Sequence, residues 1–258
     1  MMALEALIFD VDGTLSETER DGHLVAFNRA FKEAGLDWHW SEALYGELLA
    51  VTGGKERIRF YLDKYNTGFE RPDNLDEFIA GLHASKTSHY VDLLATGGIP
   101  LRKGVIRLLD EARAEGLRLA IATTTTVDNV TALLEHAVSS EAIDWFEVIG
   151  AGDVVPAKKP APDIYNYVLE KMNLKPEQCM AFEDSANGIK SAGGAGLPII
   201  ITVDSYTTHH DFTGARLILD NMGEPDQPFK VIGGSHASVV TGDDKYLNID
   251  LVRRIHSA

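Results

Sequence analysis

The chain contains little cysteine and no long apolar run. Its only cysteine, Cys179, excludes a disulfide within the 258 residues, which is typical of a reducing compartment. Cys179 heads the apolar run CMAF, so we expect a buried structural thiol and not a nucleophile. No apolar run approaches the roughly 18 residues that span a bilayer. The short run near residues 4–9 is interrupted by Glu5 and ends at Asp10, which is unlike a signal peptide.

Basic residues are scarce as well. The chain has 24 Lys and Arg against 39 Asp and Glu, which is a formal net charge of −15 at pH 7. Such a surface repels the phosphates of nucleic acids and of anionic lipids, so we expect neither nucleic acid nor a membrane as a partner. A small anionic ligand would therefore need a local pocket of positive charge. We expect a monomer.

The first third of the chain is predicted to be helical. In HLVAFNRAFKEAG (residues 23–35) apolar residues recur at spacings of three and four, and Gly35 is placed to end the helix. The segment SEALYGELLAV begins with Ser41, a candidate N-cap. Further amphipathic helices are predicted at 54–65 and 75–95. No strand pattern interrupts this block.

From about residue 100 short apolar strands alternate with helices. Continuous apolar strands of this kind are typical of a parallel sheet that is covered by helices on both faces. The pattern predicts an α/β fold with a Rossmann-like, doubly wound parallel sheet. The expected strands are LIF near the N-terminus (within 4–9), LRLAIAT (117–123), FEVIG (146–150), CMAFED (179–184), PIIITV (198–203) and a last edge strand in ARLILDN (215–221).

The helical block separates the first strand from the second, so we interpret it as an inserted, all-helical cap domain. The predicted core domain comprises residues 1–15 and 98–225, and the cap comprises residues 16–97. The remaining segment, 226–258, is part of a stretch with many Gly, Pro and Ser residues. We expect it to be loop or weakly structured.

Polar side chains follow the predicted strands at the points where the strands end. Asp10 and Asp12 follow the first strand, although strands disfavour Asp and two carboxylates this close repel each other. Ligands bind at the carboxyl ends of strands in open α/β sheets. The other residues expected at this edge are Thr123 and Thr124, Lys158 and Lys159, and Glu183 and Asp184.

These residue types suit phosphoryl transfer assisted by Mg²⁺. The ion prefers carboxylate, carbonyl and water oxygens, and it would relieve the repulsion between Asp10 and Asp12. One aspartate could then attack phosphorus, and the other could reach the leaving oxygen or the attacking water. A lysine and a threonine hydroxyl could hold the phosphoryl oxygens while charge develops on them.

Four segments in this order resemble a known family. DVDGTL, ATTTT, KKPAPDIY and FEDSANGI resemble the four motifs of the haloacid dehalogenase-like phosphohydrolase superfamily, with the helical type of cap inserted after the first motif. The resemblance covers the chain to about residue 220. It implies that Asp10 is the nucleophile and that Asp12 is the general acid and then the general base. It also implies that Thr123 and Lys159 hold the phosphoryl group, since Lys159 directly precedes a proline.

The same resemblance implies a Mg²⁺ site. Asp184 and Glu183 are expected to bind the ion together with Asp10 and the backbone carbonyl of Asp12. Asp12 also separates subclasses, because the dehalogenases and the phosphonoacetaldehyde hydrolase relatives lack an acid at this position. Phosphatases and phosphomutases have it, so the resemblance implies a phosphoric monoester hydrolase or a mutase.

Segments of the predicted cap narrow the resemblance to the CbbY-like branch. They include WHW at 38–40, TGGKERI at 52–58 and EFIAGLHASKT at 77–87, with YTTHHDF at 206–212 in the core. Characterised members of this branch resemble phosphatases of xylulose 1,5-bisphosphate, an inhibitor of Rubisco in the Calvin cycle. The resemblance therefore implies a phosphorylated sugar as substrate. It also implies the cytoplasm of a bacterium or the plastid stroma of a photosynthetic eukaryote.

A bisphosphate needs a second anion site away from the metal. Lys55 and Arg57 are the candidates for its distal phosphate, because Arg binds phosphate in a bidentate manner and Lys is a point charge. These residues could instead form the solvated face of a cap helix. The candidates for contact with the rest of the substrate are Glu19, His23, Tyr45 and Thr124.

Other interpretations remain open. A phosphomutase of the β-phosphoglucomutase kind shares all four motifs and the cap, and a phosphoglycolate-type phosphatase shares the motifs. A sugar-phosphate sensor without catalytic activity is the alternative from another class, although binding alone needs no leaving-group acid. Among the remaining polar and aromatic residues, Lys158 is expected to be solvated, Trp38 and Trp40 to lie in the cap core, and His209 and His210 to lie on the surface.

Overall fold

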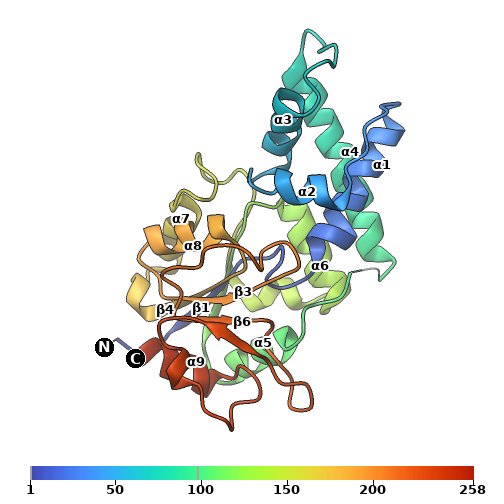
Figure 1. Ribbon diagram of the computed structural model, residues 1–258. Helices are drawn as coiled ribbons and strands as arrows, with labels where there is room; N and C mark the ends of the chain where they lie inside the picture. Colours follow the sequence, from blue (N-terminus) through green and yellow to red (C-terminus); the bar gives the residue numbers. More distant parts are fainter. Residues whose placement is uncertain (1, 98) are drawn as a thin grey trace.

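The computed structural model describes residues 2–97 and 99–258. The two predicted segments of the core domain begin at residues 1 and 98, and both of these residues lie outside the described ranges. The core is a seven-stranded sheet in the order β3-β2-β1-β4-β5-β6-β7 (Figure 1). Neighbouring strands are parallel, except for the antiparallel pair of β6 and β7. The strands are β1 (Ala6–Phe9), β2 (Arg118–Ala122), β3 (Phe146–Gly150), β4 (Cys179–Glu183), β5 (Ile199–Thr202), β6 (Leu217–Leu219) and β7 (Val231–Gly233).

Both faces of the sheet are buried. Leu7 and Phe9 of β1 belong to the apolar cluster on one face, and Ala6 and Ile8 belong to the cluster on the other, because successive side chains of a strand point to opposite sides. This explains why β1 is apolar at every position, and it confirms the predicted doubly wound α/β sheet. The face of Phe9 is covered by α5 (Val105–Ala114), α6 (Val127–Ala137) and α9 (Ile249–Ser257), and the other by α7 (Asp163–Met172) and α8 (Ala186–Gly194).

The segment between β1 and α5 forms a helical unit, which we define as residues 19–95. It stands at one end of the sheet (Figure 1). Trp40 is completely buried and Trp38 nearly so, in an aromatic core that belongs to this unit. Both were predicted to lie there. The unit comprises a π-helical turn (Glu19–Leu24), α1 (Val25–Glu33), α2 (Glu42–Leu48), α3 (Gly54–Lys64) and α4 (Leu75–Ala95).

Local capping explains where these helices begin and end. The Ser41 hydroxyl accepts a hydrogen bond of 3.2 Å from the backbone N–H of Leu44, so its predicted role as the N-cap of α2 is confirmed. Gly35, two residues after the last residue of α1, has a φ of +70°, which is the left-handed conformation that glycine tolerates at a helix end.

The end of the chain differs from the sequence-based expectation. The segment 226–258 was predicted to be loop or weak structure, yet it contains the strand β7 and the helix α9. The edge position in the sheet that was expected for β6 is occupied by β7. Leu251 and Ile255 of α9 are completely buried against the sheet. The apolar spacing of α9 is easily overlooked because the preceding stretch is rich in turn residues. Short 3₁₀ helices span Ala142–Trp145, Pro176–Gln178 and Ala237–Val239.

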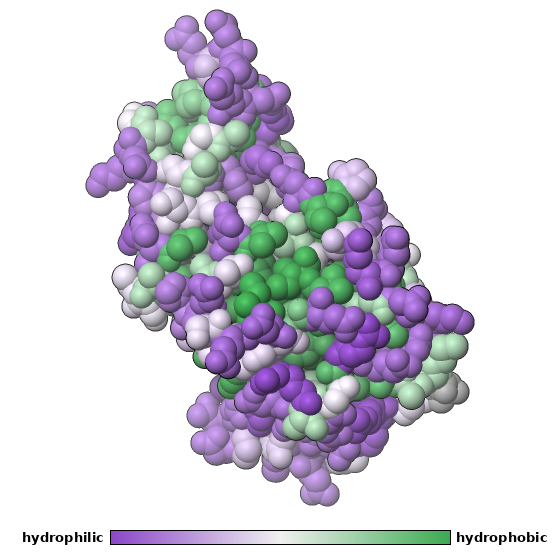
Figure 2. Space-filling view, turned by 180° about the vertical axis from the view of Figure 1, so that it is seen from behind, coloured by the Kyte–Doolittle hydropathy of each residue, from purple (hydrophilic) through white to green (hydrophobic). Residues whose placement is uncertain are grey.

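The surface contains both polar and apolar regions. Figure 2 shows the molecule from behind, with hydrophilic side chains at the outer end of the helical unit and apolar ones gathered near the middle of that face. Within residues 2–97 and 99–258, none of the helices is both long enough and apolar enough to cross a bilayer. Cys179 is buried and unpaired, as expected.

Candidate active site

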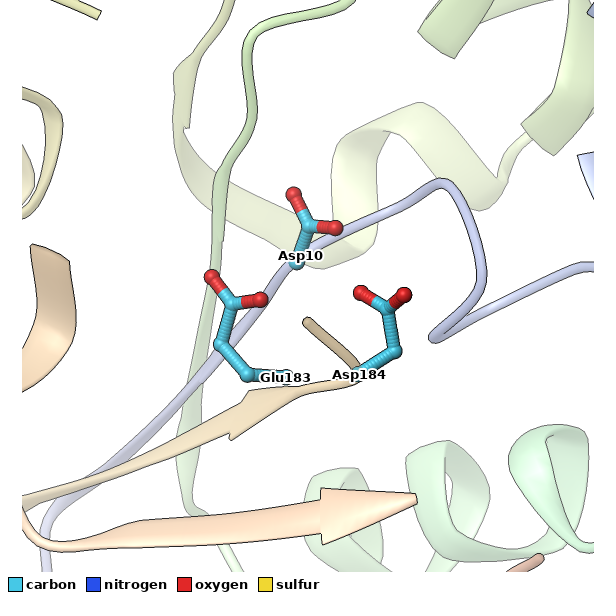
Figure 3. A group of neighbouring side chains, drawn as sticks. All are labelled: Asp10, Glu183 and Asp184. Carbon is cyan, nitrogen blue, oxygen red and sulfur yellow. The ribbon is translucent and has the colours of Figure 1, made fainter. Parts of the chain in front are cut away.

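Three carboxylates meet at the carboxyl ends of β1 and β4. The two strands are parallel neighbours, and Phe9 lies opposite Phe182, so the residues that follow them lie side by side. Asp10, Glu183 and Asp184 each offer an oxygen, and these oxygens lie within 4.8 Å of one another (Figure 3). All three residues are buried. The prediction that these acids gather at one edge of the sheet is therefore confirmed by the geometry.

Lys159 bridges two of these acids. Its Nζ lies 2.7 Å from Asp10 Oδ1 and 2.6 Å from Glu183 Oε1. The hydroxyl of Tyr165 donates a further hydrogen bond of 2.6 Å to Glu183 Oε1. Burial raises the pKa of Asp10 to about 7, although the charge of Lys159 acts in the opposite direction. A cation beside Asp10 would therefore favour its ionised form.

A cavity of about 410 Å³ opens over this cluster. Its walls combine the strand-end residues with residues of the helical unit and of the loop that follows β5. The predicted site residues that line it are Asp10, Asp12, Glu19, Arg57, Thr123, Thr124, Lys159 and Asp184.

The Asp12 side chain contacts residues in or next to the start of the helical unit. Its Oδ1 accepts a hydrogen bond of 2.5 Å from the Thr18 hydroxyl and lies 2.8 Å from Nε2 of His23. On the other side of the ring, Lys86 Nζ lies 2.8 Å from His23 Nδ1. Burial raises the pKa of Asp12, but the interaction with His23 and the hydrogen bond from Thr18 outweigh it, so the pKa is lowered. Asp12 is therefore held as a carboxylate in this conformation.

Comparison with known proteins identifies the family. A sequence model of haloacid dehalogenase-like hydrolases matches residues 4–196. The chain belongs to the haloacid dehalogenase-like hydrolase family. The plasmid CbbY protein of Cupriavidus necator is 45% identical over 90% of this chain and 92% of its own length, and CbbY of Rhodobacter capsulatus is 51% identical over 83% and 92%.

Solved structures agree with this assignment. The crystal structure of CbbY from Rhodobacter sphaeroides in complex with phosphate has a TM-score of 0.79 at 46% identity, and the match covers 84% of this chain and 94% of that chain. A crystal structure of a variant of the same protein in complex with xylulose-(1,5)bisphosphate matches with the same values. The chain is accordingly an enzyme of the haloacid dehalogenase-like family and a phosphatase of the CbbY type.

In this phosphatase three of the predicted substrate residues contact one another. The Arg57 Nη1 donates a hydrogen bond of 2.8 Å to the Tyr45 hydroxyl, which in turn donates one of 2.5 Å to Glu19 Oε2. Tyr45 is completely buried. Its hydroxyl is thus engaged in orienting Arg57, whose Nε is buried without a hydrogen-bond partner among the described residues. Arg57 itself lines the cavity over the acids and a smaller one of about 200 Å³.

Charged residues join the helical unit to the sheet beside the smaller cavity. Lys55 Nζ donates a hydrogen bond of 2.7 Å to Asp153, and Lys158 Nζ lies 3.0 Å from Glu56 and 3.0 Å from Asp153. The expectation that Lys158 is merely solvated was wrong, because its side chain is 16% exposed and is paired with two acids. The four residues form what we call the ionic bridge: Lys55, Glu56, Asp153 and Lys158.

The two adjacent histidines have different surroundings. His209 is exposed, as predicted. His210 is partly buried, and its Nδ1 accepts a hydrogen bond of 3.2 Å from the backbone N–H of Ala186, so the surface interpretation was wrong for this residue. Both histidines line the larger cavity.

Sequence reasoning missed Lys86, which is 4% exposed and lines the smaller cavity. A signal was present, because Lys86 is spaced four residues from Leu82 and four from Tyr90, which are buried on the same face of α4. A lysine within an apolar stripe predicts a buried cation. Tyr165 was missed as well, since its position six residues after Lys159 becomes meaningful only when both side chains reach Glu183.

Proposed function

We propose that the enzyme is a Mg²⁺-dependent phosphatase that hydrolyses xylulose 1,5-bisphosphate through an aspartyl-phosphate on Asp10. The observation that carries the proposal is the placement of Asp10 between a lysine and two further acids at the floor of a cavity. The crystal structure of the related CbbY with xylulose-(1,5)bisphosphate supports the choice of substrate. Because this compound inhibits Rubisco, the proposed role lies in the maintenance of the Calvin cycle.

The three acids suit a divalent cation. One ammonium, that of Lys159, faces three buried carboxylates whose oxygens lie close together, so their repulsion is only partly offset. Carboxylate oxygens are the donors that Mg²⁺ prefers. Asp10 and Asp184 would hold the ion, with Glu183 beside them and with the Asp12 backbone carbonyl as a further donor. Bound there, Mg²⁺ supplies positive charge that stabilises the phosphoryl oxygens as they become more negative.

The residues then divide the reaction into two steps. Asp10 attacks phosphorus, and the bond from phosphorus to the sugar oxygen breaks as Asp12 donates a proton to that oxygen. Asp12 then takes a proton from water, whose oxygen attacks phosphorus and releases Asp10 and inorganic phosphate. Lys159 and the hydroxyl of Thr123 hold the phosphoryl oxygens.

Asp12 must change partners to take part in these steps. In the conformation described here its carboxylate is held by Thr18 and His23, and its pKa is lowered. Both partners lie in or next to the π-helical turn at the start of the helical unit. We therefore propose that movement of this unit separates Asp12 from Thr18 and His23, so that its carboxylate takes up a proton from solvent and reaches the substrate as an acid, and that the unit acts as the cap over the site.

The smaller cavity suits the distal phosphate. Four cationic and three acidic side chains line it, so it is locally more positive than the chain as a whole, whose formal net charge is −15. Arg57 lines both this cavity and the larger one, which Asp10 also lines, so it could contact the second phosphate of a substrate whose first phosphate lies at Asp10. The cationic residues are Lys55, Arg57, Lys86 and Lys158.

The test is phosphate release at neutral pH in Mg²⁺ and again in excess EDTA. The substrates are xylulose 1,5-bisphosphate, ribulose 1,5-bisphosphate, phosphoglycolate and β-glucose 1-phosphate. We expect a strong preference for the first compound that is lost in EDTA and returns with added Mg²⁺. A preference for a monophosphate would overturn the distal phosphate site, and an isomerised sugar without phosphate release would identify a mutase.

A further inference from the structure

A fourth carboxylate lies beside the three acids of the site. Asp204 follows β5, which is the parallel neighbour of β4, and it is 5% exposed. A Cβ atom placed on Gly13 would lie 2.5 Å from Asp184 Oδ2 and 2.6 Å from Asp204 Oδ2. The two carboxylate oxygens therefore face the same point above the Gly13 backbone. Only glycine fits there, both because of this crowding and because its φ is +81°.

The turn that follows β5 fixes the orientation of Asp204. Its Oδ1 accepts a hydrogen bond of 2.7 Å from the backbone N–H of Tyr206, and its own N–H donates one of 2.9 Å to the Thr207 hydroxyl. This Asx turn uses one carboxylate oxygen and directs the other toward Asp184.

The charge of Arg102 acts to lower the pKa of both acids, but its described ion pair is with Glu17 and not with either of them. The guanidinium of Arg102 donates hydrogen bonds to the backbone carbonyls of Thr202 and Val203, and its Nε lies 2.9 Å from Glu17. Burial, and after it the negative charge of Asp204, raise the pKa of Asp184. Two buried carboxylates thus face each other at the edge of the proposed metal site.

We propose that Asp204 is a positioning residue for the divalent cation: it raises the affinity of the site through its negative charge beside Asp184 and is not a direct ligand. The proposal rests on the metal site in the proposed function. Asp204 is not one of the three acids whose oxygens lie within 4.8 Å of one another, so it acts through Asp184 and the surroundings of the ion.

If Asp204 acts through its charge, its replacement has different effects on stability with and without the cation. Without a cation Asp184 and Asp204 repel each other, so loss of the Asp204 charge favours the folded state. With a cation bound, the same loss removes the attraction between Asp204 and the cation. The change Asp204→Asn therefore affects stability in opposite directions in the two states. Asn preserves the turn, because its side-chain oxygen can accept the same hydrogen bond from Tyr206.

The experiment measures cation binding directly. Wild type, Asp204→Asn and Asp211→Asn are titrated with Mg²⁺ by calorimetry and with Mn²⁺ by electron paramagnetic resonance. Asp211 is the matched control, because it lies on the same loop and its Oδ1 caps Thr213 in the same manner, but it is exposed. We expect the dissociation constant of Asp204→Asn to rise about tenfold and that of Asp211→Asn to stay within about twofold of wild type.

Thermal unfolding in EDTA and in Mg²⁺ completes the test. We expect Asp204→Asn to unfold at the same or a higher temperature than wild type in EDTA and at a lower one in Mg²⁺. Equal cation affinity in wild type and Asp204→Asn would overturn this inference and leave the proposed function standing. A lower melting temperature in EDTA would assign Asp204 a structural role and overturn it as well. Absence of cation binding by wild type would instead overturn the proposed function.

Discussion

Lys86 Nζ lies 2.8 Å from His23 Nδ1, and this contact determines which nitrogen of His23 carries a hydrogen. An ammonium group can only donate, so Nδ1 accepts and Nε2 donates to Asp12 Oδ1 at 2.8 Å. The three side chains thus form a hydrogen-bonded chain from α4 to the end of β1. This chain links the helical unit to Asp12, and its hydrogen bond from His23 helps to lower the pKa of Asp12.

The burial of Lys86 predicts a pH dependence of stability. Burial lowers the pKa of Lys86 from 10.5 to about 8, although the charges of Asp12 and Glu19 act in the opposite direction. Between these pH values the unfolded chain holds a proton that the folded chain has lost, so Lys86 makes stability increase with pH. The slope is up to about 1.4 kcal/mol per pH unit. Below about pH 8 both states are protonated and the contribution is constant.

The measurement is chemical unfolding of wild type and Lys86→Met at intervals from pH 7 to 9.5. The variant should lose the increase of stability above about pH 8. The control is Lys32→Met, which replaces an exposed lysine and should retain the wild-type pH dependence. Parallel curves for wild type and Lys86→Met would contradict the prediction.

Replacement of the proposed nucleophile should abolish turnover. Asp10→Asn keeps the shape of the side chain but cannot attack phosphorus, so we expect phosphate release in Mg²⁺ to fall by more than about a thousandfold. The near-ultraviolet circular dichroism spectrum should be unchanged, which separates lost chemistry from lost folding. Substantial remaining turnover in this variant would eliminate Asp10 as the nucleophile.

Arg57 should distinguish bisphosphates from monophosphates. Arg57→Gln removes a charged hydrogen-bond donor from the smaller cavity, and we expect kcat/KM for xylulose 1,5-bisphosphate to fall roughly 10- to 100-fold. For a monophosphate the fall should be much smaller. Arg59→Gln is the matched control, because this arginine lies on the same helix but is exposed and pairs with Asp76. An equal loss for both substrate classes would argue against a distal phosphate site at Arg57.

The ionic bridge should influence substrate binding in a manner that depends on salt. Asp153 contacts both Lys55 and Lys158, so Asp153→Asn makes the rim of the smaller cavity more positive. We expect KM for the bisphosphate to fall about two- to fivefold at low ionic strength, and the difference from wild type to vanish at about 1 M salt. Asp110→Asn, an exposed acid on α5, should show neither effect. A decrease in KM that persists in high salt would contradict this explanation.

Patterns in the sequence predicted most of the fold and the cluster of acids at the edge of the sheet. Parallel strands end at one edge of a sheet, so the pattern of FDVDG and FEDS was enough to place Asp10, Glu183 and Asp184 together, and Lys159 joined them. The N-cap at Ser41 followed from its side chain alone. By contrast, α9 was missed because the glycine- and proline-rich stretch before it concealed a short apolar stripe.

The sequence by itself determined the order of strands and helices up to residue 221, the four strand-end motifs and the apolar faces of these elements, because these depend on neighbours along the chain. The tertiary structure alone decided which charges meet: Lys86 with His23, Lys158 with Asp153 and Glu56, and Asp204 with Asp184. Lys86 and His23 are 63 residues apart. The energy of such contacts depends on burial and on distances between side chains of separate elements, and no periodicity in the sequence encodes these quantities.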